Sequence, residues 1–214
     1  MENGMASRLL HLAAAECILK ELPIGDENRF RFGSVIPDAG ERVSAHFRIS
    51  VDNGARRTMA LTLFRERFAG HMDDPLYLGY YLHLVQDIVF RKIFYLDRGW
   101  HPDSPEKIAR LYADYRILNA WAIEKFSLRT EPTTPEHFAA EPLFAASEFR
   151  TEEFLAALHE DFLTPPPPGE CVYFTKPIAE EFLRTAVPLC LREAAALRTG
   201  GSVVDEYALS WRAE

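Results

Sequence analysis

The chain has 214 residues, of which 48% are apolar and 26% are charged. This balance is typical of a globular protein rather than of a disordered or fibrous one, and the length favours a single domain over residues 1–214. The formal net charge of -8 excludes a general attraction to nucleic acid or to anionic membrane surfaces. A small substrate, including a phosphorylated one, stays compatible with this charge, because bound metal ions can supply local positive charge.

The cysteines and the hydropathy pattern predict a cytoplasmic protein without a transmembrane segment. Cys17, Cys171 and Cys190 have no paired spacing, so no disulfide framework is indicated. Polar residues interrupt the N-terminal segment, and residues 76–96, the most apolar segment, carry too many charged residues for a membrane span. The oligomeric state is left unknown by this pattern.

The N-terminal half is expected to contain three helices and one long irregular connection. Apolar residues at helical spacing predict a first helix over residues 7–22. Residues 23–56 lose this periodicity and collect glycine and proline, which predicts a long irregular loop of the kind that often has a function. A second helix is predicted over residues 57–68, and Asp74 followed by proline opens a third helix, residues 74–95.

The C-terminal half is also predicted to be helical. The start signal SPEK predicts a helix over residues 104–126, and a shorter helix could begin in TTPEHF, residues 133–138. Further helices are expected within residues 149–214, including one that begins at about Thr151 and one over residues 175–197. No alternating strand pattern is evident. The expected fold is all-α, a single-domain multi-helix bundle with a long irregular loop after the first helix.

The segment YLGYYLHLVQDIVF in the third helix carries the most informative polar residues. His83 and Asp87 lie four residues apart and therefore project from one helical face. Gly79 lies on the same face, where a missing side chain would let another helix or loop approach closely. Taken alone, the pair is most simply explained as two core residues that bind each other.

Three further residues extend this set. His11 lies among apolar residues of the first helix, where an imidazole needs a partner, although a hydrogen-bonded core histidine would explain it equally well. Asp38 in VIPDAG could be a simple turn residue, and His46 in SAHF could be an exposed loop residue. Together with the helical pair, these residues form an ordered set of three imidazoles and two carboxylates.

That ordered set resembles the zinc-dependent phospholipase C family and its S1/P1 nuclease relatives. The resemblance rests on HLAAA in an opening helix, FGSVIPD in a loop, SAHF after it and LGYYLHLVQD in a long helix, and it covers residues 8–95. It implies a metal centre in a helical bundle, with Asp87 shared between two ions and His11 in a partial second set. The implied ligands are His11, Asp38, His46, His83 and Asp87. One or two zinc ions suit these ligands, and manganese or iron is also compatible with them.

A third ligand set, which the family also has, is incomplete in this sequence. Ile93 and Phe94 stand where the family has a histidine soon after the bridging aspartate. His137 and Glu141 in HFAAE have the spacing of the family's remaining pair, and His101 is the best additional candidate. Whether these three join the site is left open by the sequence.

The leading functional hypothesis is a metal-dependent hydrolase of a phosphoester, similar to phospholipase C. A metal-bound hydroxide would attack phosphorus, with Asp38 and Asp87 as the catalytic carboxylates. Arg91 and Lys92 could contact a phosphate, although such residues more often cap or solvate a helix end. The alternatives are a structural metal or binding role without catalysis, and a metal hydrolase or oxidase of a non-phosphate substrate.

Overall fold

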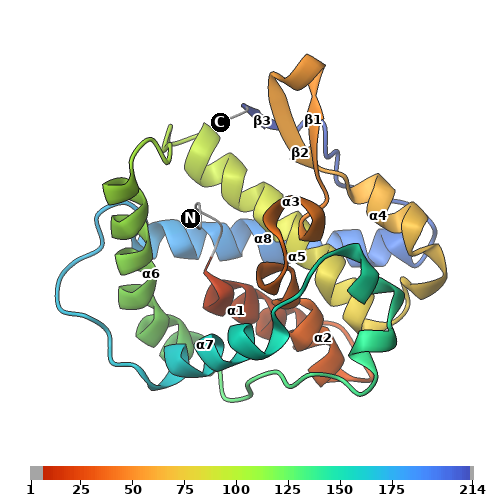
Figure 1. Ribbon diagram of the computed structural model, residues 1–214, viewed down its shortest axis with the longest axis horizontal. Coiled ribbons are helices and arrows are strands. Elements are labelled where there is room, and N and C mark those ends of the chain that lie inside the picture. The colour runs from red at the N-terminus through yellow and green to blue at the C-terminus, as the bar shows by residue number, and fades with distance from the viewer. Residues whose placement is uncertain (1–6, 213–214) are drawn as a thin grey trace.

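Helices pack around one long central helix, and a small antiparallel sheet lies at one end of the molecule (Figure 1). The structure, a computed structural model, describes residues 7–212. In chain order, the α-helices among these residues are α1 (Arg8–Leu19), α2 (Glu27–Gly33), α3 (Arg42–Ala45), α4 (Leu61–Arg67), α5 (Pro75–Arg91), α6 (Pro105–Phe126), α7 (Thr151–Leu163) and α8 (Lys176–Leu197). The strands are β1 (Arg48–Val51), β2 (Arg56–Met59) and β3 (Trp211–Arg212). The predicted all-α fold class is confirmed, with the sheet as a minor addition.

Helix α5 is central because its sequence is apolar on almost every side. It begins as predicted: Asp74 Oδ1 accepts a hydrogen bond from the Leu76 backbone N–H at 2.8 Å, and Pro75 occupies the first turn. Fifteen of its 17 residues are buried. Helices α2, α4 and α8 pack against it. The helix continues into a π-helical turn, Lys92–Leu96, which agrees with the predicted end near Tyr95.

Two glycines let α2 and α5 approach more closely than other residues would allow. A Cβ atom at Gly79 would lie 2.3 Å from the carbonyl oxygen of Phe30, and one at Gly33 would lie 2.2 Å from the carbonyl oxygen of Leu76. Both oxygens belong to the backbone, so they cannot move aside as the end of a flexible side chain could. The predicted role of Gly79 in a close approach is therefore confirmed, and α2 is the element that it admits.

The segment over residues 23–56 is more ordered than the sequence predicts. It contains α2, a 3-10 turn at Ile36–Ala39, the short helix α3 and strand β1. Helix α2 begins with a side-chain cap, in which Asp26 Oδ1 accepts a hydrogen bond from the Arg29 backbone N–H at 2.9 Å. Each of these elements is shorter than the window over which periodicity can be recognised, which is why the segment was predicted to be irregular.

The small sheet was not predicted, and it corrects the helix expected over residues 57–68. In the sheet, β1 and β2 form an antiparallel hairpin and β2 also pairs with β3. Strand β2 ends at Met59, and helix α4 begins only at Leu61. The hairpin turn places Asn53 and Gly54 at φ angles of 53° and 89°. An Asn-Gly pair is a strong hairpin signal, so the sequence did contain a cue for this turn.

The predicted helix starts in the C-terminal half are largely confirmed. Ser104 Oγ accepts a hydrogen bond from the Lys107 backbone N–H at 3.2 Å, so α6 begins where the start signal places it. Helix α7 begins at Thr151, as predicted, and α8 contains Pro188. The expected short helix in TTPEHF is wrong, because only a 3-10 turn, Phe138–Ala140, follows that segment.

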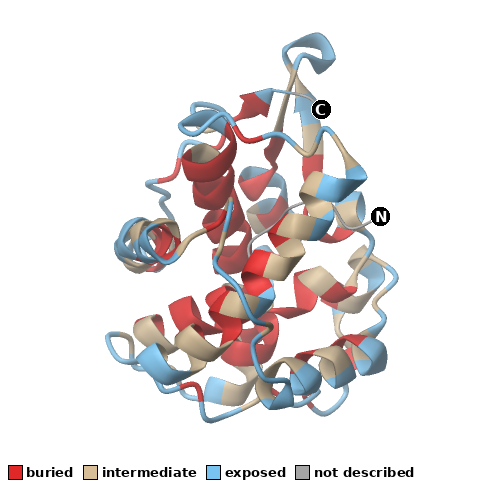
Figure 2. Ribbon diagram, turned by 90° about the vertical axis from the view of Figure 1, so that its left-hand side faces the viewer, coloured by how far each residue is buried: buried red, intermediate tan, exposed pale blue. Residues whose placement is uncertain are grey.

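One hydrophobic core runs between the helices. Figure 2 shows buried residues on the inner helices and exposed residues on the outer loops and at the tip of the hairpin. Helix α8 packs on both α5 and α1, and so covers one side of those two helices. Among residues 7–212, no helix combines the length and the apolar character that crossing a membrane requires.

Candidate metal centre

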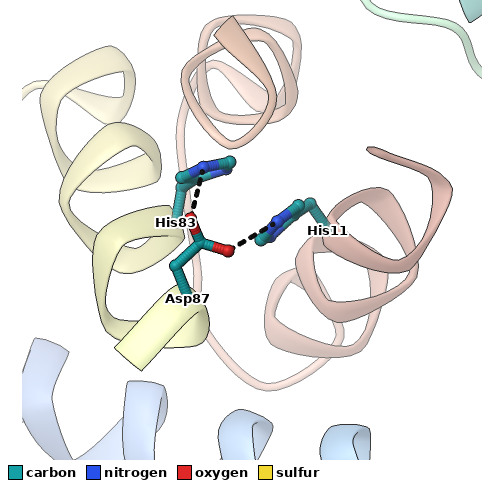
Figure 3. A group of neighbouring side chains, drawn as sticks. All are labelled: His11, His83 and Asp87. Carbon is teal, nitrogen blue, oxygen red and sulfur yellow. Dashed lines mark ion pairs between the residues drawn. The ribbon is translucent and has the colours of Figure 1, made fainter. Parts of the chain in front are cut away.

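Five side chains from four elements converge between α1 and α5. They are His11 on α1, Asp38 in the 3-10 turn, His46 at the end of α3, and His83 and Asp87 on α5. Figure 3 shows three of them, with the imidazoles of His11 and His83 close together and both facing the Asp87 carboxylate. The structure thus brings together all five residues that the sequence singles out, although the first and the last, His11 and Asp87, lie 76 positions apart in the chain.

The atoms that face one another are spaced as ligands of a cation would be. The Nε2 atoms of His46 and His83 lie 3.3 Å apart, and each lies 3.7 Å from Asp87 Oδ2. Asp38 Oδ1 lies 3.4 Å from His46 Nε2 and 3.9 Å from His83 Nε2. On the other side of the carboxylate, His11 Nε2 lies 3.4 Å from Asp87 Oδ1. Two ligands held about 2.1 Å from one ion lie about 3.0–3.6 Å apart. The observed set is within a few tenths of an ångström of that range.

The distribution of ligand atoms favours one tightly bound ion. Two groups of three residues could hold a cation, and His83 belongs to both of them. Its single inward nitrogen can bind one ion, which Asp38, His46 and Asp87 Oδ2 would also reach. The other group consists of His11, His83 and Asp87, so His11 is also within reach of that ion. A separate second ion beside Asp87 Oδ1 would receive only His11 as a further ligand from the described residues. Two protein ligands are few for stable zinc binding.

The Asp87 carboxylate is a buried group that lacks hydrogen bonds from the described residues. Its side chain is 1% exposed, and neither of its oxygens has a hydrogen-bond partner among the described residues. His11 Nε2 and His46 Nδ1 are also buried without such a partner. A buried carboxylate without compensation is costly, and in native proteins it is paired with another charge or coordinates a metal. These atoms fit a site that binds a cation.

The backbone orients His83 toward the same point. His83 Nδ1 lies 2.9 Å from the carbonyl oxygen of Ser34, to which it donates a hydrogen bond. A neutral imidazole that carries its proton on Nδ1 has a lone pair on Nε2, the atom that faces His46, Asp38 and Asp87. Ser34 follows α2, so the close contact between α2 and α5 sets the orientation of this ring.

The electrostatics of the centre also suit a cation. Burial lowers the pKa of His83 to about 3, with a further contribution from the charge of His11, so this imidazole is neutral near pH 7. Burial opposes ionisation of Asp87, but the interaction with His11 and the charges of the neighbouring histidines outweigh it and hold the pKa of Asp87 well below its usual range. The pKa of Asp38 is lowered as well, since its interactions with His83 and His46 outweigh burial.

Zinc binding is expected to weaken as the pH falls. Burial opposes protonation of His11, but the interaction with the nearby Asp87 carboxylate outweighs it and raises the pKa of His11 above 6.5. Below that raised pKa, the metal must displace a proton, so the affinity should fall about tenfold per pH unit for one displaced proton. Calorimetric titration with zinc in two buffers of different ionisation enthalpy measures this release. An affinity that stays constant between about pH 5 and pH 8 would contradict the prediction.

Asp38 is the most exposed of the five side chains at the centre. Its side chain is 16% exposed, whereas the side chains of His11, His46, His83 and Asp87 are exposed by 0%, 2%, 0% and 1%. Asp38 is therefore the residue through which the centre contacts solvent. A structural zinc site is typically closed by four protein ligands, whereas a catalytic one keeps an accessible position.

The candidates for a third ligand set lie elsewhere. His101 and His137 are exposed, and neither belongs to a group of described residues that could hold a cation. Glu141 is committed to other contacts, because it accepts hydrogen bonds from Arg29 at 2.9 Å and from the Tyr77 hydroxyl at 3.1 Å. The spacing of HFAAE is therefore explained by a loop that α2 and α5 hold in place.

The two basic residues after Asp87 have different environments. Arg91 is fully buried, with its guanidinium 4.7 Å from the Tyr95 ring and 4.6 Å from the Trp211 ring, so it does not solvate the helix end. Lys92 forms an ion pair with Asp97 at 2.7 Å on the surface, which is the ordinary role considered for it. Neither assignment depends on a phosphate.

Gln86 and Ser34 contact the site but were not singled out from the sequence. The contact of Ser34 is made by a backbone carbonyl, which no residue type signals in advance. Gln86 is an uncharged residue in a buried helix, and its 2.9 Å contact with His11 depends on how α1 packs against α5.

No family model matches the chain, and no curated protein or solved structure matches it either.

Proposed function

We propose that the protein is a metal-dependent hydrolase of a phosphoester and that its centre binds zinc. The observation that carries the proposal is the buried Asp87 carboxylate, faced by three imidazoles and left without a hydrogen bond from the described residues. Mixed imidazole and carboxylate ligands are those of catalytic zinc sites more than of structural ones, which favour cysteine. Manganese and iron bind the same ligand types.

The chemistry proposed for the centre depends on Asp38, its most exposed residue. A bound zinc ion lowers the pKa of a coordinated water and screens negative charge on phosphoryl oxygens. The lowered pKa keeps the Asp38 carboxylate ionised near neutral pH, and its partial exposure lets it accept a hydrogen bond from an attacking water. Asp87 keeps His11 and His83 in place from the buried side.

The phosphoester substrate is proposed on two grounds. First, the order of the ligand-bearing segments resembles that of the zinc-dependent phospholipase C family. Second, because the net charge of -8 does not attract anions, a bound cation would supply the local positive charge that attracts a small anionic substrate. A metal hydrolase of a non-phosphate substrate would use the same ligands, so the substrate must be tested directly.

Hydrolysis of simple phosphoesters tests the proposal. The zinc-loaded protein is expected to hydrolyse p-nitrophenyl phosphate or bis(p-nitrophenyl) phosphate, as measured by p-nitrophenol release. Asp38→Asn should lower kcat by about 100-fold or more, since it removes the partly exposed carboxylate that is proposed to accept a hydrogen bond from the attacking water. His137→Ala, at an exposed position outside the centre, should leave kcat unchanged.

A structural metal is the competing proposal, and the burial of the centre favours it. Four of the five side chains are buried, and a cation there would fasten the turn and α3 onto α1 and α5. In that case the purified protein would contain zinc and unfold at a lower temperature after chelation, but neither substrate would be hydrolysed. Zinc content without turnover would therefore favour the structural proposal over the hydrolase.

A further inference from the structure

Gln86 lies on α5 immediately before Asp87 and points toward α1. Its side chain is fully buried, and its Oε1 lies 2.9 Å from His11 Nδ1. The opposite nitrogen of the same ring, Nε2, lies 3.4 Å from Asp87 Oδ1. One residue of α5 thus contacts the outer side of the imidazole, and the next residue faces its inner side.

The contact with Gln86 decides where the His11 ring carries its proton. A side-chain carbonyl can only accept a hydrogen bond, so Nδ1 must donate, and a neutral ring then has its lone pair on Nε2. A reversed amide would present an NH₂ group to Nδ1. The proton would then sit on Nε2, between the ring and Asp87, and would block coordination at that atom.

The environment at the other end of the amide favours the same orientation. Cys190 on α8 lies beside Gln86, and its thiol donates to the carbonyl oxygen of Leu82 at an Sγ–O distance of 3.8 Å. With its proton so directed, the sulfur offers no donor to the amide oxygen, and Gln86 Nε2 has no hydrogen-bond partner among the described residues. Cys190 therefore gives the amide oxygen no alternative to its contact with His11.

We infer that Gln86 is a positioning residue for the metal centre, which holds His11 in the tautomer that makes it a ligand beside Asp87. The inference rests on the metal centre of the proposed function, not on its substrate. A residue that hydrogen-bonds the outer nitrogen of a ligating imidazole typically changes metal affinity by about 10–100-fold when it is replaced. Gln86 has this geometry with respect to His11.

Zinc affinity in two Gln86 variants tests the inference. In Gln86→Met the side chain keeps its length and burial but loses the acceptor, and zinc binding should weaken about 10–100-fold. Gln86→Glu keeps an acceptor at the same position and should bind zinc at least as tightly as the wild type. Dissociation constants are measured by competition with a chromophoric chelator on the full chain, and thermal unfolding of each metal-free variant reports any loss of stability.

A second readout follows the ring itself. In the zinc-loaded wild type, ¹⁵N NMR of the histidines should place the His11 proton on Nδ1, which remains decisive if Gln86→Met does not fold. A proton on Nε2, or Gln86→Met with wild-type affinity, overturns the role of Gln86. A wild type that binds no zinc overturns the metal centre and this inference with it. A wild type that binds zinc without hydrolysing a phosphoester overturns only the hydrolase.

Discussion

Asp87→Asn is expected to lower zinc affinity by about 100-fold or more and to leave the protein almost free of metal after dialysis. One oxygen of the Asp87 carboxylate faces His11, and the other faces His46 and His83. Asp87 is therefore the carboxylate that all three imidazoles share. Asparagine keeps the shape but removes the charge, and an amide that presents its NH₂ group to the centre would repel a cation. Metal content is measured by mass spectrometry on dialysed protein.

Two controls separate the loss of a ligand from a general loss of stability. Asp114→Asn changes an equally buried carboxylate that accepts hydrogen bonds from the backbone of Val172, Tyr173 and Phe174, away from the centre. It should destabilise the fold but retain zinc in the folded fraction. His137→Ala should retain both stability and zinc. Equal metal loss in Asp87→Asn and His137→Ala would show that the ligand assignment is wrong.

Gly79→Ala is expected to destabilise the fold by about 3 kcal/mol or more and to reduce zinc binding as well. The added methyl group would meet the Phe30 carbonyl oxygen at 2.3 Å and the Ser34 backbone nitrogen at 3.0 Å, both in or next to α2. Since α2 would have to move away from α5, the Ser34 carbonyl would leave its position beside His83. Chemical denaturation measures the change in the free energy of unfolding, and calorimetry measures zinc affinity.

Gly70→Ala is the matched control for this substitution. A Cβ atom at Gly70 would meet nothing within 4 Å, so the free energy of unfolding should change by less than about 0.5 kcal/mol. If Gly79→Ala has an equally small effect, the close packing of α2 against α5 is not required for the fold. If it unfolds the protein without affecting zinc in the remaining folded fraction, the link from α2 to His83 is not supported.

The sequence predicts the long elements of the fold better than it predicts the short elements. Regular spacing of apolar residues and clear start signals located α5 and α6, and Gly79 indicated where another helix or loop would approach. The elements within residues 23–56 were missed because each depends on neighbours that are distant in the chain. The turn at Asn53 was signalled locally, but an apolar helical pattern nearby was given more weight.

The candidate site was predictable where it depends on side-chain type and order. His83 and Asp87 share a helical face, and the order of the other segments added His11, Asp38 and His46. Their convergence is confirmed by the structure, whereas the bound metal, the substrate and the resemblance to a phospholipase C family stay predictions. The atoms that orient the rings could not be predicted, because a backbone carbonyl and an amide oxygen act through tertiary placement alone.

All five converging side chains precede residue 88, whereas α8, which lies over α1 and α5, begins at Lys176. A ribosome therefore extrudes the complete donor set almost ninety residues before the cover emerges from the exit tunnel. If the proposed zinc binds the chain at that stage, it can enter from the side on which α8 later packs. Loading during synthesis and loading after release would consequently follow different routes into the same centre.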